Sequence, residues 1–420
     1  MTKETPEKDT FEPLVRALVA GERRLHELPG DLAADEAARI RRLALEEITG
    51  ADLTSLGTYS FSAATASTRH CENFVGAAHI PIGVAGPLPV KGRFAAGDFY
   101  IPLATTEGAL VASVNRGCAA LRRAGGVTAL AENAGITRAP AFRTAGIAES
   151  HALVAWVRKN FDRLADVARK SDPFLRLIDV EPHIMGTTVY LRFIFDTGDA
   201  MGMNMATIAC DRMVRDVISP ETGAPCLALS GNFCVDKKPA MLNILRGRGR
   251  RISAEVTLSG EIVREVLKTT TAALLEVHAR KILLGSIAAG ALGFNAHFAN
   301  VVAAFFLATG QDAAHVSEGA LGITIVERRE PDGAYVAVQM PDVPLAAIGG
   351  GTGLATQKAA LRLLGVDPAS SGRAPGESAL ALAEILGAAV LAGELSLLSA
   401  LASSDLANAH LALARGVQTK

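Results

Sequence analysis

The N-terminal part of the chain shows apolar positions at helical spacing. Leucines recur in this way over residues 14–28, up to a polar break at Pro29-Gly30-Asp31. A second run, residues 33–48, is rich in Ala, Glu, Arg and Leu and closes at Gly50, a residue that commonly follows the last turn of a helix. The pattern predicts a helical N-terminal segment over residues 1–70.

A different order of elements follows in residues 140–228. Apolar residues occupy every second position from Val189 to Phe195, which is typical of a strand with one buried face. Residues 148–170 instead carry apolar side chains at three- and four-residue spacing and end at Ser171-Asp172-Pro173, as an amphipathic helix does. The predicted elements are a strand at 141–147, a helix at 148–170, strands at 174–180 and 188–195, a helix at 204–218 and a strand at 226–229. This β-α-β-β-α-β order is the ferredoxin-like signature.

The rest of the chain is expected to be mostly helical. Residues 57–97 are rich in Gly and Pro and favour loops and strands. After residue 250 we expect one hairpin, with strands at 323–327 and 334–338 around a Pro331-Asp332-Gly333 turn. Residues 376–415, rich in Ala and Leu, predict a long helix. The fold class is therefore α+β.

One stretch is apolar enough to raise the question of a membrane. Residues 282–311 contain no Lys, Arg, Asp or Glu over a length that could span a bilayer. Asn295, His297 and Asn300 lie near its middle, where polar groups in lipid are most costly. The sequence therefore favours a buried helix pair and no membrane contact.

Composition and charge exclude several classes of protein. A length of 420 residues suggests two or three domains, and a hydrophobic fraction of 49% excludes a disordered chain. The net charge of −1 argues against a general nucleic-acid binder. Five scattered cysteines, none spaced as CxxC, fit neither a disulfide framework nor a zinc site. Together with a charged N-terminus that lacks a secretory h-region, they indicate a cytoplasmic protein.

No Rossmann GxGxxG or P-loop signature is found, so neither usual nucleotide fold is predicted. Five charged or titratable residues stand among small or apolar neighbours. They are Glu107, Lys237, Lys238, Asp312 and His410. If buried, a carboxylate such as that of Glu107 would have a raised pKa and could donate a proton. Taken singly, each of the five is more often a paired structural residue than a catalyst.

Ordered motifs connect these residues. They are 72–76 with 81–88, 105–108 with 111–117, 199–205 (DAMGMNM), 231–239, 295–297, 310–314, 349–352 and 393–397. Together they resemble the signatures of the 3-hydroxy-3-methylglutaryl-coenzyme A (HMG-CoA) reductase family, from about residue 70 to the C-terminus. The lysine loop and DAMGMNM resemble the branch typical of eukaryotes, but the chain lacks that branch's membrane domain.

The resemblance implies a domain organisation and a fold. A large, mostly helical domain, residues 71–139 and 229–420, would bind substrate and coenzyme A. The small ferredoxin-like domain, residues 140–228, would be inserted in it and bind the nicotinamide cofactor. The family also implies a homo-oligomer, a dimer or a dimer of dimers, with active sites between subunits and no metal.

The resemblance also implies a reaction and its catalytic residues. HMG-CoA would be reduced to mevalonate and free coenzyme A with two NAD(P)H, or the reverse, through a hemithioacetal and mevaldehyde. Lys237 would stabilise the developing oxyanion. Asp312 would set protonation within a coupled cluster, a protonated Glu107 would donate to the aldehyde oxygen, and His410 would protonate the departing thiolate.

Two alternatives stay open. The first is a reductase of the same fold for another acyl-coenzyme A. The second is a non-enzymatic membrane or scaffold protein built on residues 282–311.

Binding residues follow from the same motifs. The substrate carboxylate would be held by a cationic and polar group of residues. This group comprises Arg138, Ser230, Asp236, Lys238 and Lys281. Positions near the thioester and the coenzyme A arm are Asn115, Lys268, His297 and Asn300. The cofactor would be held by Asp172, Asp199, Met201, Gly202, Met203, Asn204, Gly349 and Gly350, with its phosphates on the backbone N–H groups at the helix start after Gly202.

The cofactor is predicted to be NADH rather than NADPH. In NADPH-using relatives a Ser-Arg pair holds the 2′-phosphate, and the aligned positions here are Asp172 and Pro173. A carboxylate there would repel a phosphate and accept a hydrogen bond from a ribose hydroxyl. The competing interpretation is that Asp172-Pro173 only ends a helix and that Arg176 holds the phosphate.

Overall fold

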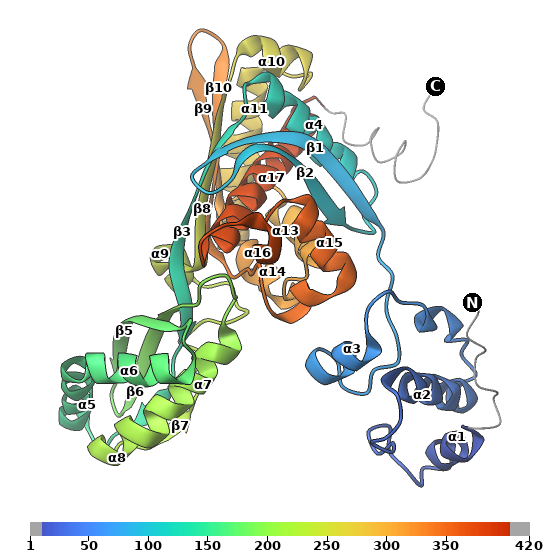
Figure 1. The fold of residues 1–420 in the computed structure, drawn as a ribbon. Coiled ribbons are helices and arrows are strands. Elements are labelled where there is room, and N and C mark those ends of the chain that lie inside the picture. Colours follow the sequence, from blue (N-terminus) through green and yellow to red (C-terminus); the bar gives the residue numbers. More distant parts are fainter. Residues whose placement is uncertain (1–10, 404–420) are drawn as a thin grey trace.

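The computed structural model describes residues 11–403, and Figure 1 shows three groups of elements along the chain. The N-terminal group is helical, as predicted, with α1 (Glu12–Val19), α2 (Ala34–Thr49), the 3₁₀ turn η2 (Thr54–Gly57) and α3 (Ala63–Arg69). Helix α2 begins where the Glu36 side chain accepts the Ala33 N–H, and it ends at Gly50 in the left-handed conformation. Phe11, Val15 and Ile40 form its small core with α1.

The largest group is built on a six-stranded sheet. Its strands are β1 (Ile82–Gly92), β2 (Ala96–Ala104), β3 (Val127–Arg138), β8 (Arg248–Leu258), β9 (Ile323–Arg329) and β10 (Gly333–Val343). They pair in the order β2-β1-β3-β8-β10-β9, and only β1 and β3 run parallel. The hairpin β9–β10 confirms the predicted one. The sheet is more extensive than a mostly helical domain implies, because β3 and β8 were not predicted.

Helices cover this sheet and fill its core. The longest, α17 (Glu377–Ala402), is almost wholly buried and packs on α4 (Leu110–Arg123) and α13 (Phe298–Thr309). The other helical elements of this group are α9 (Met241–Arg246), α10 (Gly260–Glu265), α11 (Thr271–Val277), η4 (His278–Gly285), α12 (Ser286–Ala289), η5 (Ala313–His315), α14 (Val316–Gly319), η6 (Gly350–Gly353), α15 (Ala355–Leu363) and α16 (Pro368–Ser371).

The apolar stretch 282–311 forms the predicted pair of helical segments, but only the second is buried: Leu284 and Ile287 in the first are exposed. The chain forms η4 and α12, leaves the helix at Gly290 and returns in the buried α13. Among residues 11–403, the one helix long and apolar enough to cross a membrane is α17. Its most apolar window is 83% buried inside the protein, as in the core helix of a soluble fold.

The third group confirms the ferredoxin-like prediction. Its elements are β4 (Ala141–Arg143), α5 (Ile147–Lys159), α6 (Phe161–Ser171), β5 (Arg176–Met185), β6 (Thr188–Asp196), α7 (Met203–Met213), η3 (Val214–Ile218), α8 (Ser219–Thr222) and β7 (Cys226–Ala228). The strands pair in the order β7-β4-β6-β5, all antiparallel. The single helix expected over 148–170 is divided at Asn160, whose side chain donates to the carbonyl of Trp156.

One strand belongs to both sheets. The first part of β3 pairs with β8 in the large sheet, and its last three residues pair with β6 in the small one. Between the two parts lies Gly135, at φ +79°, where the register of β3 shifts. The two sheets are therefore joined by continuous backbone, as the downward course of β3 in Figure 1 shows.

The close packing of α4 on α17 requires a glycine at position 117. A Cβ at Gly117 would lie 2.0 Å from the carbonyl oxygen of Ala392, so the two helix backbones meet directly at this position. We predict that Gly117→Ala destabilises the protein by about 1–3 kcal/mol or more, the cost of overpacking against atoms that cannot rotate away.

Gly146→Ala is the matched control, because nothing lies within 4 Å of a Cβ built there. The measurement is the denaturant midpoint of each variant and of the parent. Equal midpoints for the two variants would contradict this account of the α4–α17 contact.

Candidate active site

The loop between β7 and α9 places Lys237 in contact with Asp312. Lys237 Nζ lies 2.7 Å from Asp312 Oδ2, and Asp312 Oδ1 accepts the backbone N–H of Ala314 at the start of η5. The loop holds Asn232, Val235 and Lys237 at φ between +51° and +63°. Left-handed backbone at non-glycine residues costs free energy and is concentrated at functional sites.

The ionisation of Asp312 follows from these contacts. Partial burial raises the pKa of this carboxyl group, but the hydrogen bonds from Lys237 and Ala314 and the charges of His315 and Lys237 outweigh burial and lower the pKa below its ordinary value. The carboxyl group of Asp312 is therefore protonated only below the ordinary range of aspartate.

Neighbouring polar residues close around this pair. Arg138, at the end of β3, donates from Nη1 to Ser230 Oγ at 2.9 Å, and its Nε is buried with no hydrogen-bond partner. Asp236 forms an ion pair with Arg248 at 2.9 Å, and Lys238 Nζ donates to the Asp236 carbonyl oxygen. The structure thus brings six predicted residues of the carboxylate and catalytic groups to one cluster around this loop.

Four of them, Arg138, Asp236, Lys237 and Asp312, line a cavity of about 730 Å³ together with most of the predicted cofactor residues. The cavity walls include Met201, Gly202, Met203 and Asn204 at the start of α7, and Gly349 and Gly350 before α15. Gly202 is at φ +89°, and a Cβ there would lie 2.1 Å from Thr197 Cγ2, so the turn requires glycine. Arg69 and His70 also line the cavity; the sequence analysis missed them because they lie outside the recognised motifs.

Two predicted cofactor residues occupy other positions. Asp199 accepts the backbone N–H groups of Gly376 and Ala379 with its two carboxylate oxygens, at 2.8 and 2.9 Å, and so caps the start of α17. Asp172 accepts the backbone N–H of Phe174 where α6 ends. Neither side chain lines the cavity.

The remaining predicted residues form a second group. Asn300 Nδ2 lies 3.0 and 2.8 Å from the two oxygens of Glu107, and Asn115 Oδ1 accepts the backbone N–H of Gly86. Glu107 is exposed in the single chain, so the condition of burial considered for its carboxylate is not met there. Glu107 lies in the turn between β2 and α4, which belong to the large group and contribute no residue to the cavity wall.

Other members of the second group are likewise absent from the cavity wall. His297 Nε2 is buried with no hydrogen-bond partner, while Lys268 and Lys281 are exposed. His410, the predicted thiolate donor, lies outside the described residues.

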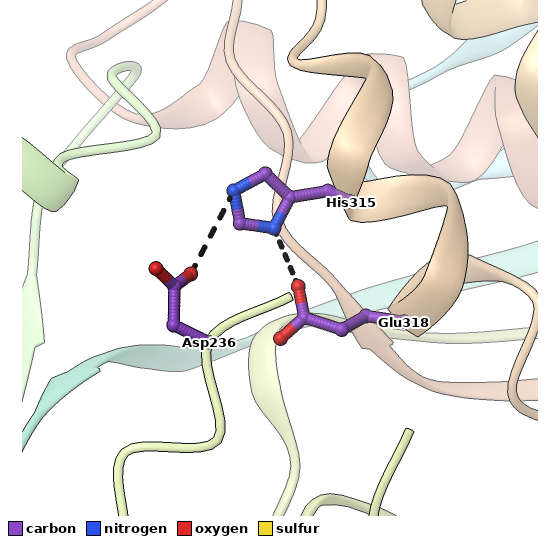
Figure 2. A group of neighbouring side chains, drawn as sticks. All are labelled: Asp236, His315 and Glu318. Atoms are coloured by element: carbon purple, nitrogen blue, oxygen red, sulfur yellow. Dashed lines mark hydrogen bonds and ion pairs between the residues drawn. The ribbon is translucent and has the colours of Figure 1, made fainter. Parts of the chain in front are cut away.

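A buried charge cluster lies beneath the lysine loop. One potential ligand atom from each of Asp236, His315 and Glu318 lies within 4.8 Å of the others, which is close enough to suggest metal ligands. Figure 2 shows the three side chains facing one another. The Arg248 guanidinium, however, lies 2.9 Å from Asp236 Oδ1 and 2.8 Å from Glu318 Oε1. Because a fixed cation already joins the two carboxylates, the group is an ion-pair network rather than a metal site.

Comparison with known proteins agrees with this geometry. The sequence pattern of the hydroxymethylglutaryl-coenzyme A reductase family matches residues 37–415. The chain is 50% identical to the 3-hydroxy-3-methylglutaryl-coenzyme A reductase of Methanothermobacter thermautotrophicus, over 95% of this chain and 98% of that protein. It is 42% identical to reductase 1 of Arabidopsis thaliana, over 98% of this chain and 69% of that protein.

A solved structure shares the fold. The class II 3-hydroxy-3-methylglutaryl-CoA reductase of Streptococcus pneumoniae, bound to NADPH in open conformations, superposes with a TM-score of 0.62, covering 94% of this chain and 97% of that one at 19% identity. The family match extends over both sheets and the lysine loop, and the chain therefore belongs to the hydroxymethylglutaryl-coenzyme A reductase family.

Proposed function

We propose that this protein interconverts HMG-CoA and mevalonate with release or uptake of coenzyme A, using two equivalents of a nicotinamide cofactor. The observation that carries the proposal is the Lys237–Asp312 ion pair, which lines one cavity with Arg138 and the glycine-methionine turn 201–204. The names of relatives at about 50% identity over nearly the whole chain support the same substrate.

The proposed chemistry assigns a role to each residue in the cavity. Lys237 stabilises the negative charge that develops on the thioester and aldehyde oxygens, because a fixed ammonium group in a partly desolvated site opposes that charge. Asp312 holds the lysine ammonium group in place. Arg138, Ser230 and Lys238 supply donors for the free carboxylate of the hydroxymethylglutaryl group, and Asp236 belongs to the same set of residues. Lys281, which does not line this cavity, would complete the set from a second copy of the chain.

The cavity suits a dinucleotide. The turn after Gly202 presents the N–H groups of the first turn of α7, and the unpaired Arg138 Nε is a further buried donor at the same wall. The proposed cofactor contacts are the backbone of residues 201–204 and of Gly349 and Gly350. When bound, the nicotinamide supplies the hydride for each of the two reductions.

We further propose that the working enzyme is a homo-oligomer, a dimer or a dimer of dimers, with each active site formed between two subunits. Glu107, the proposed proton donor to the aldehyde, and its partner Asn300 do not line the cavity that contains Lys237. A second copy of the chain would supply Glu107 to that cavity, with Asn115, Lys268 and His297 towards coenzyme A and His410 as donor to the thiolate. The five free cysteines support a reducing, cytoplasmic location.

The role of Lys237 has a direct test. We predict that Lys237→Ala lowers kcat by about 10²–10³-fold or more, the loss expected when one oxyanion-stabilising group is removed. The assay is oxidation of NAD(P)H with HMG-CoA, and Lys159→Ala, at an exposed lysine of α5, is the matched control. A Lys237→Ala enzyme within about tenfold of the parent would contradict the assigned role. Turnover only of another acyl-coenzyme A would favour the alternative substrate.

The shared active site is tested by mixing two inactive variants. If Glu107 of one subunit acts with Lys237 of another, a heterodimer of Glu107→Gln and Lys237→Ala contains one intact site. The purified heterodimer is then expected to show about half of parental activity, because one of its two sites is intact. Co-expressed chains with two different tags, purified in tandem, provide the measurement. No activity above that of the separate variants would indicate sites within one chain.

We also propose a preference for NADH over NADPH. Asp172 and Pro173 stand where a Ser-Arg pair would hold a 2′-phosphate, and the alternative cation, Arg176, forms an ion pair with Asp196 at 2.5 Å. The S. pneumoniae enzyme is bound to NADPH, but at 19% identity it supports the fold alone. The charge of Asp172 would oppose a phosphate dianion and favour a ribose hydroxyl.

This preference is measured as kcat/KM for both cofactors. We expect the parent to favour NADH and Asp172→Ser/Pro173→Arg to move the ratio towards NADPH by tenfold or more, about 1.4 kcal/mol. A parent that favours NADPH, or a double variant with an unchanged ratio, would overturn the proposal.

A further inference from the structure

His315 is a fully buried histidine beside the site to which no role has been assigned. It lies in η5, and its Nδ1 is 2.5 Å from Glu318 Oε2. Its Nε2 has no hydrogen-bond partner, but it points towards Asp312 Oδ2 at 3.7 Å and Asp236 Oδ1 at 3.9 Å. The same ring therefore faces three carboxylates, one of which holds Lys237.

The hydrogen-bond partners of the His315 ring restrict which of its two nitrogen atoms carry a proton. Glu318 accepts a hydrogen bond from Arg248 at 2.8 Å through Oε1, which leaves Oε2 as an acceptor for an Nδ1–H of the ring. A neutral ring with its proton on Nδ1 would direct the Nε2 lone pair at the oxygens of Asp312 and Asp236. An imidazolium instead presents an N–H to those carboxylates and leaves no lone pair opposed to negative charge.

The charges around the ring lead to the same result. The groups facing it or its partners are the carboxylates of Asp236, Asp312 and Glu318 and the cations of Arg248 and Lys237. Asp342, from β10, lies in the same network, where burial and then the charge of Glu318 raise its pKa well above the ordinary value. Among the groups that contact the ring or its partners directly, three carboxylates face two cations, and a protonated His315 balances them.

We propose that His315 is a buried imidazolium that positions the active-site carboxylates, and through Asp312 positions Lys237 for reaction. Glu318 fixes the ring from one side and Asp236 faces it from the other (Figure 2), while the same Nε2–H also faces Asp312. Loss of the proton turns an attractive contact into a repulsive one and releases Asp312. The inference rests on the proposed role of Lys237.

Two substitutions of His315 distinguish the contribution of its contact with Glu318 from the contribution of its positive charge. The amide of Asn can donate to Glu318 in place of Nδ1 but is too short to reach Asp312 or Asp236. The longer Gln can place an N–H towards those carboxylates but cannot gain or lose a charge. We expect His315→Asn to lower kcat by about a hundredfold, the scale of loss when a reacting group is misplaced by about 1 Å.

Partial rescue by Gln is the expected second result. His315→Gln should recover a large part of the kcat lost in His315→Asn, with the KM for HMG-CoA changed little in both. The alkaline fall in kcat that loss of the His315 proton causes in the parent should be absent from the Gln variant, because an amide does not titrate. His151→Gln, at an exposed histidine of α5, is the control and should match the parent.

The protonation state is also measured without turnover. In nitrogen NMR spectra of the full-length protein labelled at histidine, the signals lost in His315→Gln belong to His315. We expect both ring nitrogens to be protonated at pH 7, and thermal melting checks that each variant is folded. A neutral ring, or a folded Asn variant with parental kcat and pH profile, would overturn the proposal. Lys237→Ala, assayed alongside, separates this failure from failure of the proposed function, since an active Lys237→Ala enzyme removes the role of the lysine itself.

Discussion

The arrangement of the site depends on one buried guanidinium group, that of Arg248. This side chain is fully buried and bonds to Thr137 on β3, to Asp236 in the lysine loop and to Glu318 in α14, while it also contacts the sulfur of Met203 in α7. Desolvating such a cation is costly unless every donor finds an acceptor, and breaking one contact leaves an uncompensated charge. The strands, the lysine loop and the cofactor helix are therefore held in one mutual geometry.

A second contact, made by Asp199, also stabilises the turn that leads into α7. Asp199 caps the start of α17, the central helix of the large group, with both carboxylate oxygens. The residues that follow it form the cavity wall at Gly202 and Met203. A change in the position of the small sheet relative to the large one would therefore change the geometry of the proposed cofactor site.

The sequence was most informative where a pattern repeats or a motif is contiguous. The alternation in β6 and the glycine that ends α2 identified those elements, and the lysine loop and the aspartate segment pointed to Lys237 and Asp312. Strand β8 was missed although Ile252, Ala254, Val256 and Leu258 alternate with polar residues, a signal that could have found it.

Other features could not be predicted because they depend on long-range contacts. Arg248 and His315 belong to the site only because strands and loops distant in sequence meet there, and an isolated sequence gives no sign of that meeting. The exposure of Glu107 has the same origin, since burial is a property of the assembled surface. Asp199 was assigned to the cofactor from its motif, whereas its side chain bonds to residues far along the chain.

The pairing of β4 with β7 has a consequence for how this chain is assembled as modules. Ala141, where the chain enters the ferredoxin-like unit, is the register partner of Ala228, where the chain leaves it. Antiparallel partners lie about 5 Å apart, a gap that a two-residue turn can close. The ferredoxin-like unit therefore takes the place of a single loop in the large group of elements. The chain thus leaves this unit beside the point where it entered it.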